Sequence, residues 1–183
     1  MIFIVIFLLI LILPVIIFIS VYNNLQRNRV ETDASWSNIG TALQQRNDLI
    51  GNLVETVKGY ASHESSVLED VTKWRSLSSN ASNTEEQNLA DAGLHRAMIN
   101  LNAVAENYPN LKADQHFASL QNDLARLEEQ IKHSRSAYNN TVRNYNAAIA
   151  VFPGNLVAGI ANLKPRDFFI SDEQANKIPM VKF

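Results

Sequence analysis

Side chains able to bind a metal or transfer protons are present in this chain, but their spacing does not bring them together. The four histidines are far apart: His63, His95, His116 and His133. A zinc or di-iron site on helices typically uses histidines one turn apart, or paired Glu-x-x-His motifs on facing helices. Neither pattern occurs. A site assembled from distant helices is the remaining alternative, and we predict no metal-binding residue.

Motifs for nucleophilic catalysis and phosphate binding are also missing from the sequence. The chain has no cysteine, which excludes a thiolate nucleophile, a disulfide and a lipidated cysteine. It has no Gly-rich phosphate loop and no Gly-x-Ser-x-Gly motif, and no serine, histidine and acid can be grouped by spacing. We therefore expect no catalytic or cofactor-binding residue, and a protein that is not an enzyme.

A first group of polar residues could recognise a ligand. Asp48, Asn52 and Glu55 fall on adjoining turns of one predicted helix, beside its apolar seam. They form either a recognition face or the solvated outer face of a helix that is capped and bent near Gly51. We favour the second interpretation.

A second group is the repeated pair Tyr138-Asn139 and Tyr145-Asn146. The tyrosines fall on an apolar stripe, so packing with the hydroxyl near an edge accounts for them. The asparagines lie beside that stripe, where they could form hydrogen bonds between helices or fix the register. Ligand binding there is the alternative.

The elements that must position these residues begin with a hydrophobic segment. Residues 1–21 carry no charge, and the first charged side chain is Arg27. About 20 helical residues cross the roughly 30 Å hydrocarbon core, so 1–21 is predicted to be a transmembrane anchor in contact with membrane lipids. A cleaved signal peptide is disfavoured, because a basic n-region and a small-x-small cleavage site are missing. Arg27 and Arg29 follow the span, which favours a cytoplasmic C-terminal domain.

Residues 22–152 are predicted to form a helical bundle, because apolar residues recur there every three or four positions. The first register runs from Trp36 to Trp74 and continues from the span, and the sequence leaves open a bend or break near Asn47–Gly51. Arg46 and Glu64 occupy seam positions that should be apolar.

Two more helices complete the predicted bundle. Residues 76–84 are expected to form a polar turn, with Thr84 and Gln87 as a capping box for a helix that ends before Pro109. A last long stripe runs from Phe117 to Phe152. Short connections make successive helices antiparallel. The predicted fold class is all-α: an N-terminal transmembrane helix followed by an up-and-down antiparallel bundle of three to four long helices.

The C-terminal tail, residues 153–183, differs from the bundle. Leu156, Val157, Ile160 and Leu163 predict one short amphipathic helix, and Phe168-Phe169 forms an apolar pair. These residues either pack against an end of the bundle, which we favour, or contact a bilayer or a partner. The last residues, through Ile178-Pro179, are expected to be extended or loose.

Several stretches in the same order along the chain resemble the LemA family. They are Tyr22-Asn23 with Arg27, Arg29, Val30 and Trp36; Arg46–Ile50; Asn52–Glu64; Glu106–Ala113; Phe117 with Leu120-Gln121; Arg135 with Tyr138-Asn139; Tyr145-Asn146; and Phe152-Pro153 with Asn155–Gly159. The resemblance implies a bacterial cytoplasmic (inner) membrane protein with one span and a helical bundle, without established enzymatic activity. Family members are tied to membrane-associated processes, including the formation of magnetosome membranes. The family usually has proline where this chain has Gly51, so the resemblance leaves open an unbent helix.

Net charge and composition limit the classes of partner that the protein can bind. The net charge is -2 and the pI about 6.1, which gives no basic face for nucleic acid. We expect a membrane-anchored scaffold or adaptor that binds an unidentified protein partner. Self-association into a homo-oligomer is expected if the stripe of the last helix, 117–152, is not fully covered within one chain. The alternative is a membrane-remodelling or lipid-organising protein whose tail segment 155–163 contacts the bilayer.

Overall fold

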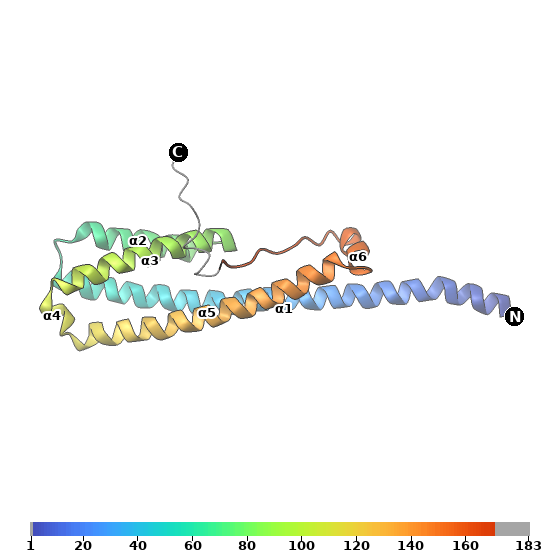
Figure 1. Cartoon of the computed structure of the whole chain (residues 1–183), viewed down its shortest axis with the longest axis horizontal. Coiled ribbons are helices and arrows are strands. Elements are labelled where there is room, and N and C mark those ends of the chain that lie inside the picture. The colour runs from blue at the N-terminus through green and yellow to red at the C-terminus, as the bar shows by residue number, and fades with distance from the viewer. Residues whose placement is uncertain (1, 171–183) are drawn as a thin grey trace, which may run out of the picture. The chain divides into compact units, whose positions relative to one another are not determined.

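The computed structural model describes residues 2–170, and this part of the chain consists of helices without any strand. The all-α fold class is therefore confirmed. The helices are α1 (Ile2–Tyr60), α2 (Ser65–Asn80), α3 (Thr84–Glu106), α4 (Pro109–Lys112), α5 (Gln115–Ala150) and α6 (Gly154–Ile160) (Figure 1).

Helix α1 begins in the hydrophobic segment and continues well past it. Its first turns are long and apolar enough to cross a membrane, and none of their described side chains is buried by the rest of the protein. Phe3 is 87% exposed and Ile10 is 68% exposed, which only a lipid environment makes favourable. Pro14 lies inside the helix without ending it. This segment fits the predicted membrane anchor.

The helix does not break near Asn47–Gly51, a question that the sequence left open, because α1 is helical through Gly51 to Tyr60. The chain instead turns at residues 61–64, where Glu64 N–H donates to the Ala61 carbonyl. Tyr60 and Val67 are seven residues apart, which is two helical turns. The helical spacing of apolar residues therefore continues across the turn at 61–64, and the turn cannot be recognised from that spacing. The register from Trp36 to Trp74 therefore belongs to two helices, α1 and α2.

The described residues form two compact parts, each built from separated segments. The four-helix unit comprises residues 38–135 with 169 and 170, and the anchor unit comprises 2–37 and 136–168. The predicted division into 1–21, 22–152 and 153–183 concerns consecutive segments and stays a prediction.

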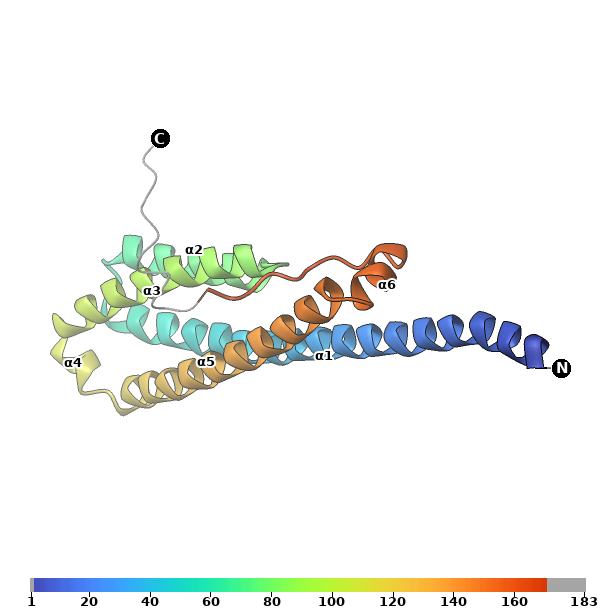
Figure 2. The ribbon, with the colours of Figure 1, turned by 45° about the vertical axis from the view of Figure 1, so that its right-hand side comes forward.

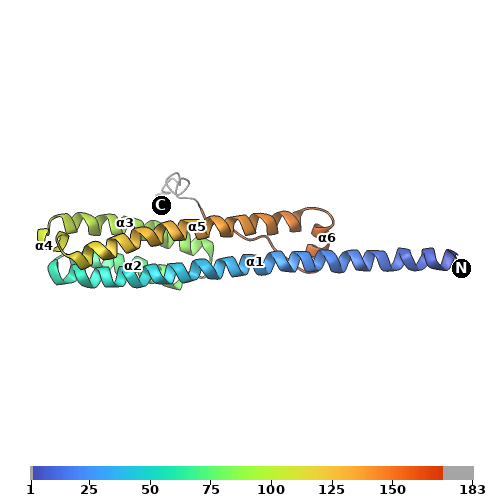
Figure 3. The same ribbon diagram turned by 90° about the horizontal axis from the view of Figure 1, so that it is seen from below.

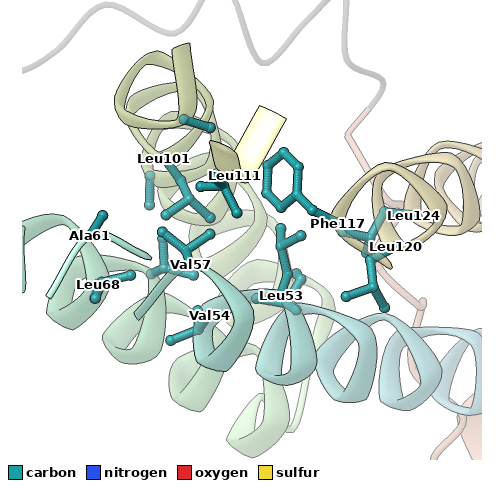
Figure 4. Packing of buried hydrophobic residues seen from close by; sticks show 14 of the residues in the cluster. Leu53, Val54, Val57, Ala61, Leu68, Leu101, Leu111, Phe117, Leu120 and Leu124 are labelled. Carbon is teal, nitrogen blue, oxygen red and sulfur yellow. The ribbon is translucent and has the colours of Figure 1, made fainter. Parts of the chain in front are cut away.

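In the four-helix unit, the C-terminal part of α1, then α2, α3 and the N-terminal part of α5 alternate in direction, as predicted. The short connections 61–64 and 81–83 account for this. Their apolar faces meet in one core, in which Leu53, Val57, Leu101 and Leu111 are each 0% exposed (Figure 4). Phe117 and the leucines after it on α5 complete the core.

The start of α3 corrects two sequence predictions. The polar turn is only 81–83, because α2 reaches Asn80. The N-cap is Asn83, whose Oδ1 accepts from Glu86 N–H at 2.9 Å. The Glu86 carboxylate reaches back to Ser82 N–H at 2.8 Å. Thr84 and Gln87 are not the capping box: both are buried, because they face the bundle interior.

In the anchor unit, the last part of α5 lies along α1, and α6 packs on both (Figures 2 and 3). The Trp36 and Tyr138 rings are 5.7 Å apart, and Leu25 packs with Tyr145 and Ile149. The chain therefore runs antiparallel to α1 as it approaches the span.

The tail behaves in two ways. Val157 of α6 is buried against the anchor unit, and Phe169 is buried in the four-helix unit. Leu156 and Ile160 of α6 and Phe168 are exposed instead. The expectation for Ile178-Pro179 lies outside the described residues.

Candidate functional site

A buried polar layer crosses the four-helix unit, and each of its four long helices contributes to it. We use this name for eight residues: Arg46 and Asn47 of α1, Ser78 and Ser79 of α2, Gln87 and Asp91 of α3, and Glu128 and Arg135 of α5. Arg46, Asn47, Ser78 and Gln87 are buried, at positions where apolar residues would be expected, while Ser79 and Glu128 are exposed at the edge of the layer.

Asp91 is the centre of the layer. Its Oδ1 accepts from Arg46 Nη2 at 2.6 Å and from Gln87 Nε2 at 2.9 Å. Its Oδ2 accepts from Arg135 Nη2. Glu128, which is half exposed, lies 3.5 Å from Arg46 Nη1. Two guanidinium groups thus face two carboxylates, which compensates the charges buried by the bundle.

Ser78 joins the layer to α2. Its Oγ accepts hydrogen bonds from Arg46 Nη2 at 3.0 Å, Gln87 Nε2 at 3.0 Å and Asn47 Nδ2 at 3.4 Å. Each of these neighbours is a donor, so none acts as a base that would make Ser78 a nucleophile. The lone pairs of Asp91 are likewise engaged. The layer is therefore built to hold helices together.

Phe169 of the tail covers one end of the polar layer. Its ring lies 5.3 Å from Arg135 Cζ, within the range of a cation–π contact. Phe169 is 3% exposed. The Arg135–Asp91 pair beside this ring is largely but not fully buried, with side-chain exposures of 15% and 14%, and partial burial strengthens the electrostatic attraction between the two groups.

The repeated Tyr-Asn pairs of α5 hold the tail. Asn146 Oδ1 accepts from Arg166 N–H at 2.9 Å, and its Nδ2 donates to the Arg166 carbonyl at 2.8 Å. The Tyr138 hydroxyl donates to the Asp167 carbonyl at 3.2 Å. Burial is the main cause that raises the pKa of Tyr138. Asn146 therefore binds the main chain of the tail after α6, where the sequence suggested contacts between helices.

The face formed by Asp48, Asn52 and Glu55 is exposed on α1, as the solvated-face interpretation predicts. It borders an open hollow, whose other lining residues include Thr72 and Arg75 of α2. The hollow holds few apolar side chains, in contrast to most small-molecule sites.

The four histidines are dispersed over helices and a turn. His133 Nε2 lies 3.3 Å from Glu129 Oε1 on the exposed face of α5. Between residues 2 and 170, no three His, Cys, Asp or Glu side chains gather in a way that could hold a metal ion.

One further polar contact joins the end of α1 to the start of α5. The Tyr60 hydroxyl donates to Asp114 Oδ2 at 2.8 Å, and Asp114 Oδ1 accepts from His116 and Phe117 N–H at the start of α5. The Phe117 N–H contributes most to lowering the pKa of Asp114, followed by the Tyr60 hydroxyl. The same hydroxyl bond raises the pKa of Tyr60. Asp114 therefore caps α5.

Of the polar layer, only Arg46 was visible in the sequence, as a charge at a seam position. Asp91, Gln87 and Arg135 were missed. A signal was present: each is polar at a position that falls on the buried face of its helix. The partners of Arg46 become apparent only when four helices are brought together.

Comparison with known proteins finds relatives over nearly the whole chain. A family model described as the LemA family matches residues 35–183. Magnetosome protein MamQ 2 of Paramagnetospirillum magneticum is 26% identical over 200 residues, which cover 93% of this chain and 73% of that protein. Magnetosome protein MamQ of Magnetospirillum gryphiswaldense is 24% identical, with coverages of 90% and 67%. Protein LemA of Metamycoplasma hominis is 29% identical over 161 residues, with coverages of 83% and 72%.

Proposed function

Because this chain belongs to the LemA family, we propose that it is a non-enzymatic scaffold, anchored in a bacterial cytoplasmic membrane, that binds other proteins through its helical bundle. The magnetosome names of its relatives favour a role at a membrane. The geometry adds that α1 is both the membrane anchor and a core helix of the bundle, so any protein bound to the bundle is recruited to the bilayer.

The observation that carries this proposal is a second apolar face on α3. Leu89, Ala92, Ile99 and Ala103 are exposed on one side of the helix, at spacings of three, seven and four residues, and the exposed Arg96 lies between Ala92 and Ile99. Leu89 is 62% exposed and Ile99 is 55% exposed. On a helical wheel this face is opposite the buried one, which carries Leu94, Ala97 and Leu101. The exposed alanines would let another helix approach closely.

Self-association is one form that binding to α3 could take. The stripe of α5 is buried within each unit from Phe117 to Ile149, so covering it does not require a second copy. We propose the outer face of α3 as the contact. Self-assembly predicts a detergent-solubilised particle heavier than one 20.5 kDa chain with its micelle. A particle of monomer mass would exclude it.

Photo-crosslinking in native membranes tests the scaffold role. A photoreactive amino acid replaces Leu89 or Ile99, and His95 serves as the matched control, because it is exposed on α3 but lies outside the apolar face. We expect specific crosslinked proteins, identified by mass spectrometry, from Leu89 and Ile99 and none of these from His95. The doubly substituted variant Leu89→Glu, Ile99→Glu should lose them. Equal background crosslinking from all three positions would contradict the proposal.

We also propose that the bundle faces the cytoplasm, since Arg27 and Arg29 follow the span. The chain has no native cysteine, so an exposed Asn100→Cys variant reports sidedness directly. A membrane-impermeant maleimide should label it only after the cells are opened. Labelling in intact cells would place the bundle outside.

A further inference from the structure

Exposed apolar side chains outside the span are concentrated at the turn from α5 into α6. We call residues 151–160 the elbow. Phe152 is 77% exposed and Ile160 is 74% exposed, while Val151 and Leu156 are each 59% exposed. Exposing a cluster of large apolar groups to water is unfavourable, so such a patch marks a contact surface.

The elbow lies in a long stretch without charge. Between Arg143 and Lys164 no residue is charged, and the polar side chains are asparagine and tyrosine. Helix α6 is apolar on two faces: Val157 and Ala158 are buried in the anchor unit, while Leu156 and Ile160 point away from it. Packing within the anchor unit explains why the buried face of α6 is apolar. It does not explain why the exposed face is apolar.

The position of the elbow along α1 indicates what covers that outer face. At 1.5 Å per residue, a hydrocarbon core of about 30 Å that begins near Ile2 ends near Val21. Val21 and Leu25 are the α1 residues that pack with α6 and the end of α5. Figure 3 shows α6 beside this part of α1. The elbow is therefore level with the boundary between acyl chains and headgroups.

Gly154 holds α6 close to this level. A Cβ at this position would lie 2.0 Å from the Ala148 carbonyl oxygen and 3.8 Å from Leu25 Cδ2. The chain can thus turn back tightly against the last turn of α5 only because residue 154 has no side chain. Phe152, two residues before Gly154, is exposed at this turn.

Aromatic and cationic residues surround the same level. Tyr22 is exposed and its ring stacks on Phe18, with centroids 6.4 Å apart, as in the aromatic belts of membrane proteins. Arg27, Arg143 and Lys164 are exposed. On α1 the first acidic residue is Glu31, farther from the span than Arg27. The charges nearest the headgroups are therefore positive, which complements anionic lipids.

We propose that the elbow is a second, interfacial membrane contact, in which Phe152, Leu156 and Ile160 insert at the boundary of an anionic bilayer beside the transmembrane helix. A protein partner would also bury apolar side chains, but it would not explain why the patch coincides with the end of the span. The contact attaches the last part of α5 to the membrane, so the anchor unit is held at two points.

Lipid-quenching fluorescence on the intact chain tests this contact. Single-cysteine variants at Ile160, at Phe7 in the span and at Ile99 on α3 are labelled with an environment-sensitive fluorophore and reconstituted in vesicles of phosphatidylcholine and phosphatidylglycerol. Ile99 is the matched control, because it is also an exposed isoleucine. Brominated acyl chains should quench the labels at Ile160 and Phe7 and leave that at Ile99 unchanged. Replacing Phe152 and Leu156 with serine should reduce the quenching at Ile160.

The outcomes separate lipid from protein contacts and from the scaffold role. Measurements use less than one chain per vesicle, so a second copy cannot shield the label. A label at Ile160 that emits as in water, or that is shielded but not quenched by brominated lipid, would overturn the proposal. Neither result affects the crosslinking expected from α3, because the two faces lie on different helices.

Discussion

The four-helix unit holds two kinds of interior that differ in almost every physical respect. Around Leu53, Val57 and Leu101 the core is apolar and its side chains are fully buried (Figure 4). Around Arg46 and Asp91 the interior is a network of ion pairs and hydrogen bonds. An apolar core gains free energy from burial whichever way its side chains are paired. A polar network is favourable only when each group meets its partner.

The polar layer leaves some of its buried groups without partners, which costs free energy. The Nε atoms of Arg46 and Arg135 and Oδ1 of Asn47 are buried without a hydrogen-bond partner, and each such group costs about 1–3 kcal/mol. The layer therefore contributes less to net stability than its number of bonds suggests. We infer that its contribution is selective: it favours the one arrangement in which α1, α2, α3 and α5 bring these groups together.

The sharpest test of this contrast is Asp91→Ala. It leaves the Arg46 and Arg135 guanidinium groups largely buried, with Glu128 beside Arg46 as the remaining carboxylate of the layer. We expect a loss of about 3–5 kcal/mol in the free energy of unfolding, because breaking a buried pair from one side leaves charge uncompensated. Urea denaturation of the detergent-solubilised protein, followed by circular dichroism, measures it. An isosteric apolar replacement of all three residues (Arg46→Met, Asp91→Leu, Arg135→Met) should recover most of the loss; failure to recover it would mean that the ion pairs themselves supply the stability.

In the apolar core, Leu101→Ala should cost about 2–4 kcal/mol through lost burial and the cavity that remains. Unlike the Asp91 loss, this one should not be recovered by changing any partner. The same denaturation experiment applies. A cost below that of an exposed control, Leu89→Ala, would mean that the core near Leu101 is not closely packed.

Adding one methyl group at either of two helical glycines, Gly93 or Gly51, tests how closely their surroundings are packed. A Cβ at Gly93 would lie 2.1 Å from Trp74 Cδ2, inside a ring that packs on the core. Gly93→Ala should therefore destabilise the protein by about 1–3 kcal/mol, as overpacking does. The midpoint of thermal unfolding should fall, and Trp74 fluorescence should shift as the ring moves. An unchanged midpoint would contradict the tight packing.

Gly51→Ala is expected to have the opposite sign. Its Cβ would meet only the end of the long Arg75 side chain, Nη1 at 2.1 Å and Cζ at 3.4 Å, and that group can move into the open hollow. Alanine is favoured over glycine inside a helix by about 1 kcal/mol. The midpoint of thermal unfolding should rise slightly or stay the same. A clear fall would show that Arg75 is fixed against α1.

The smallest effect concerns pH. The Ser82 N–H is the main cause that lowers the pKa of Glu86 below its ordinary 4.5. A carboxylate with a lowered folded-state pKa stabilises the fold above its ordinary pKa, and the contribution is lost as the pH falls through the lower, folded value. The difference in unfolding midpoint between wild type and Glu86→Gln should therefore be largest near pH 7 and shrink below about pH 4. A difference that does not change with pH would show that the charge is irrelevant.

Local periodicity was sufficient to predict much of this architecture. The uncharged first segment, the stop before Pro109 and the stripe that begins at Phe117 each depend on neighbours in sequence, and the structure has them. The stripe was predicted to reach Phe152, but α5 ends at Ala150 and Phe152 is 77% exposed. Family membership agrees with the resemblance drawn from the motifs. The sequence left a break near Gly51 open because Asp48 and Gly51 permit a helix break without requiring one, and α1 does not break there. In the structure the apolar face of α1 packs continuously past them.

What could not be predicted depends on residues that meet only in three dimensions. The seven-residue spacing between Tyr60 and Val67 continued the helical pattern of apolar residues across the turn at 61–64, so the turn was not predicted. Arg46 was conspicuous, but nothing near it in sequence indicates that its partner is Asp91. The docking of the tail was still harder to predict, because Asn146 binds the main chain of Arg166, twenty residues later in the sequence.

Because Asn146 binds main-chain atoms of the tail, the residue at position 166 is free to change in evolution. Asn146 contacts only the amide and carbonyl of Arg166, so it is insensitive to the side chain at that position. The Arg166–Asp33 ion pair is exposed and adds little. Almost any residue can therefore replace Arg166 in a descendant of this chain while the tail stays docked. Proline is the exception, because it has no N–H to give to the asparagine.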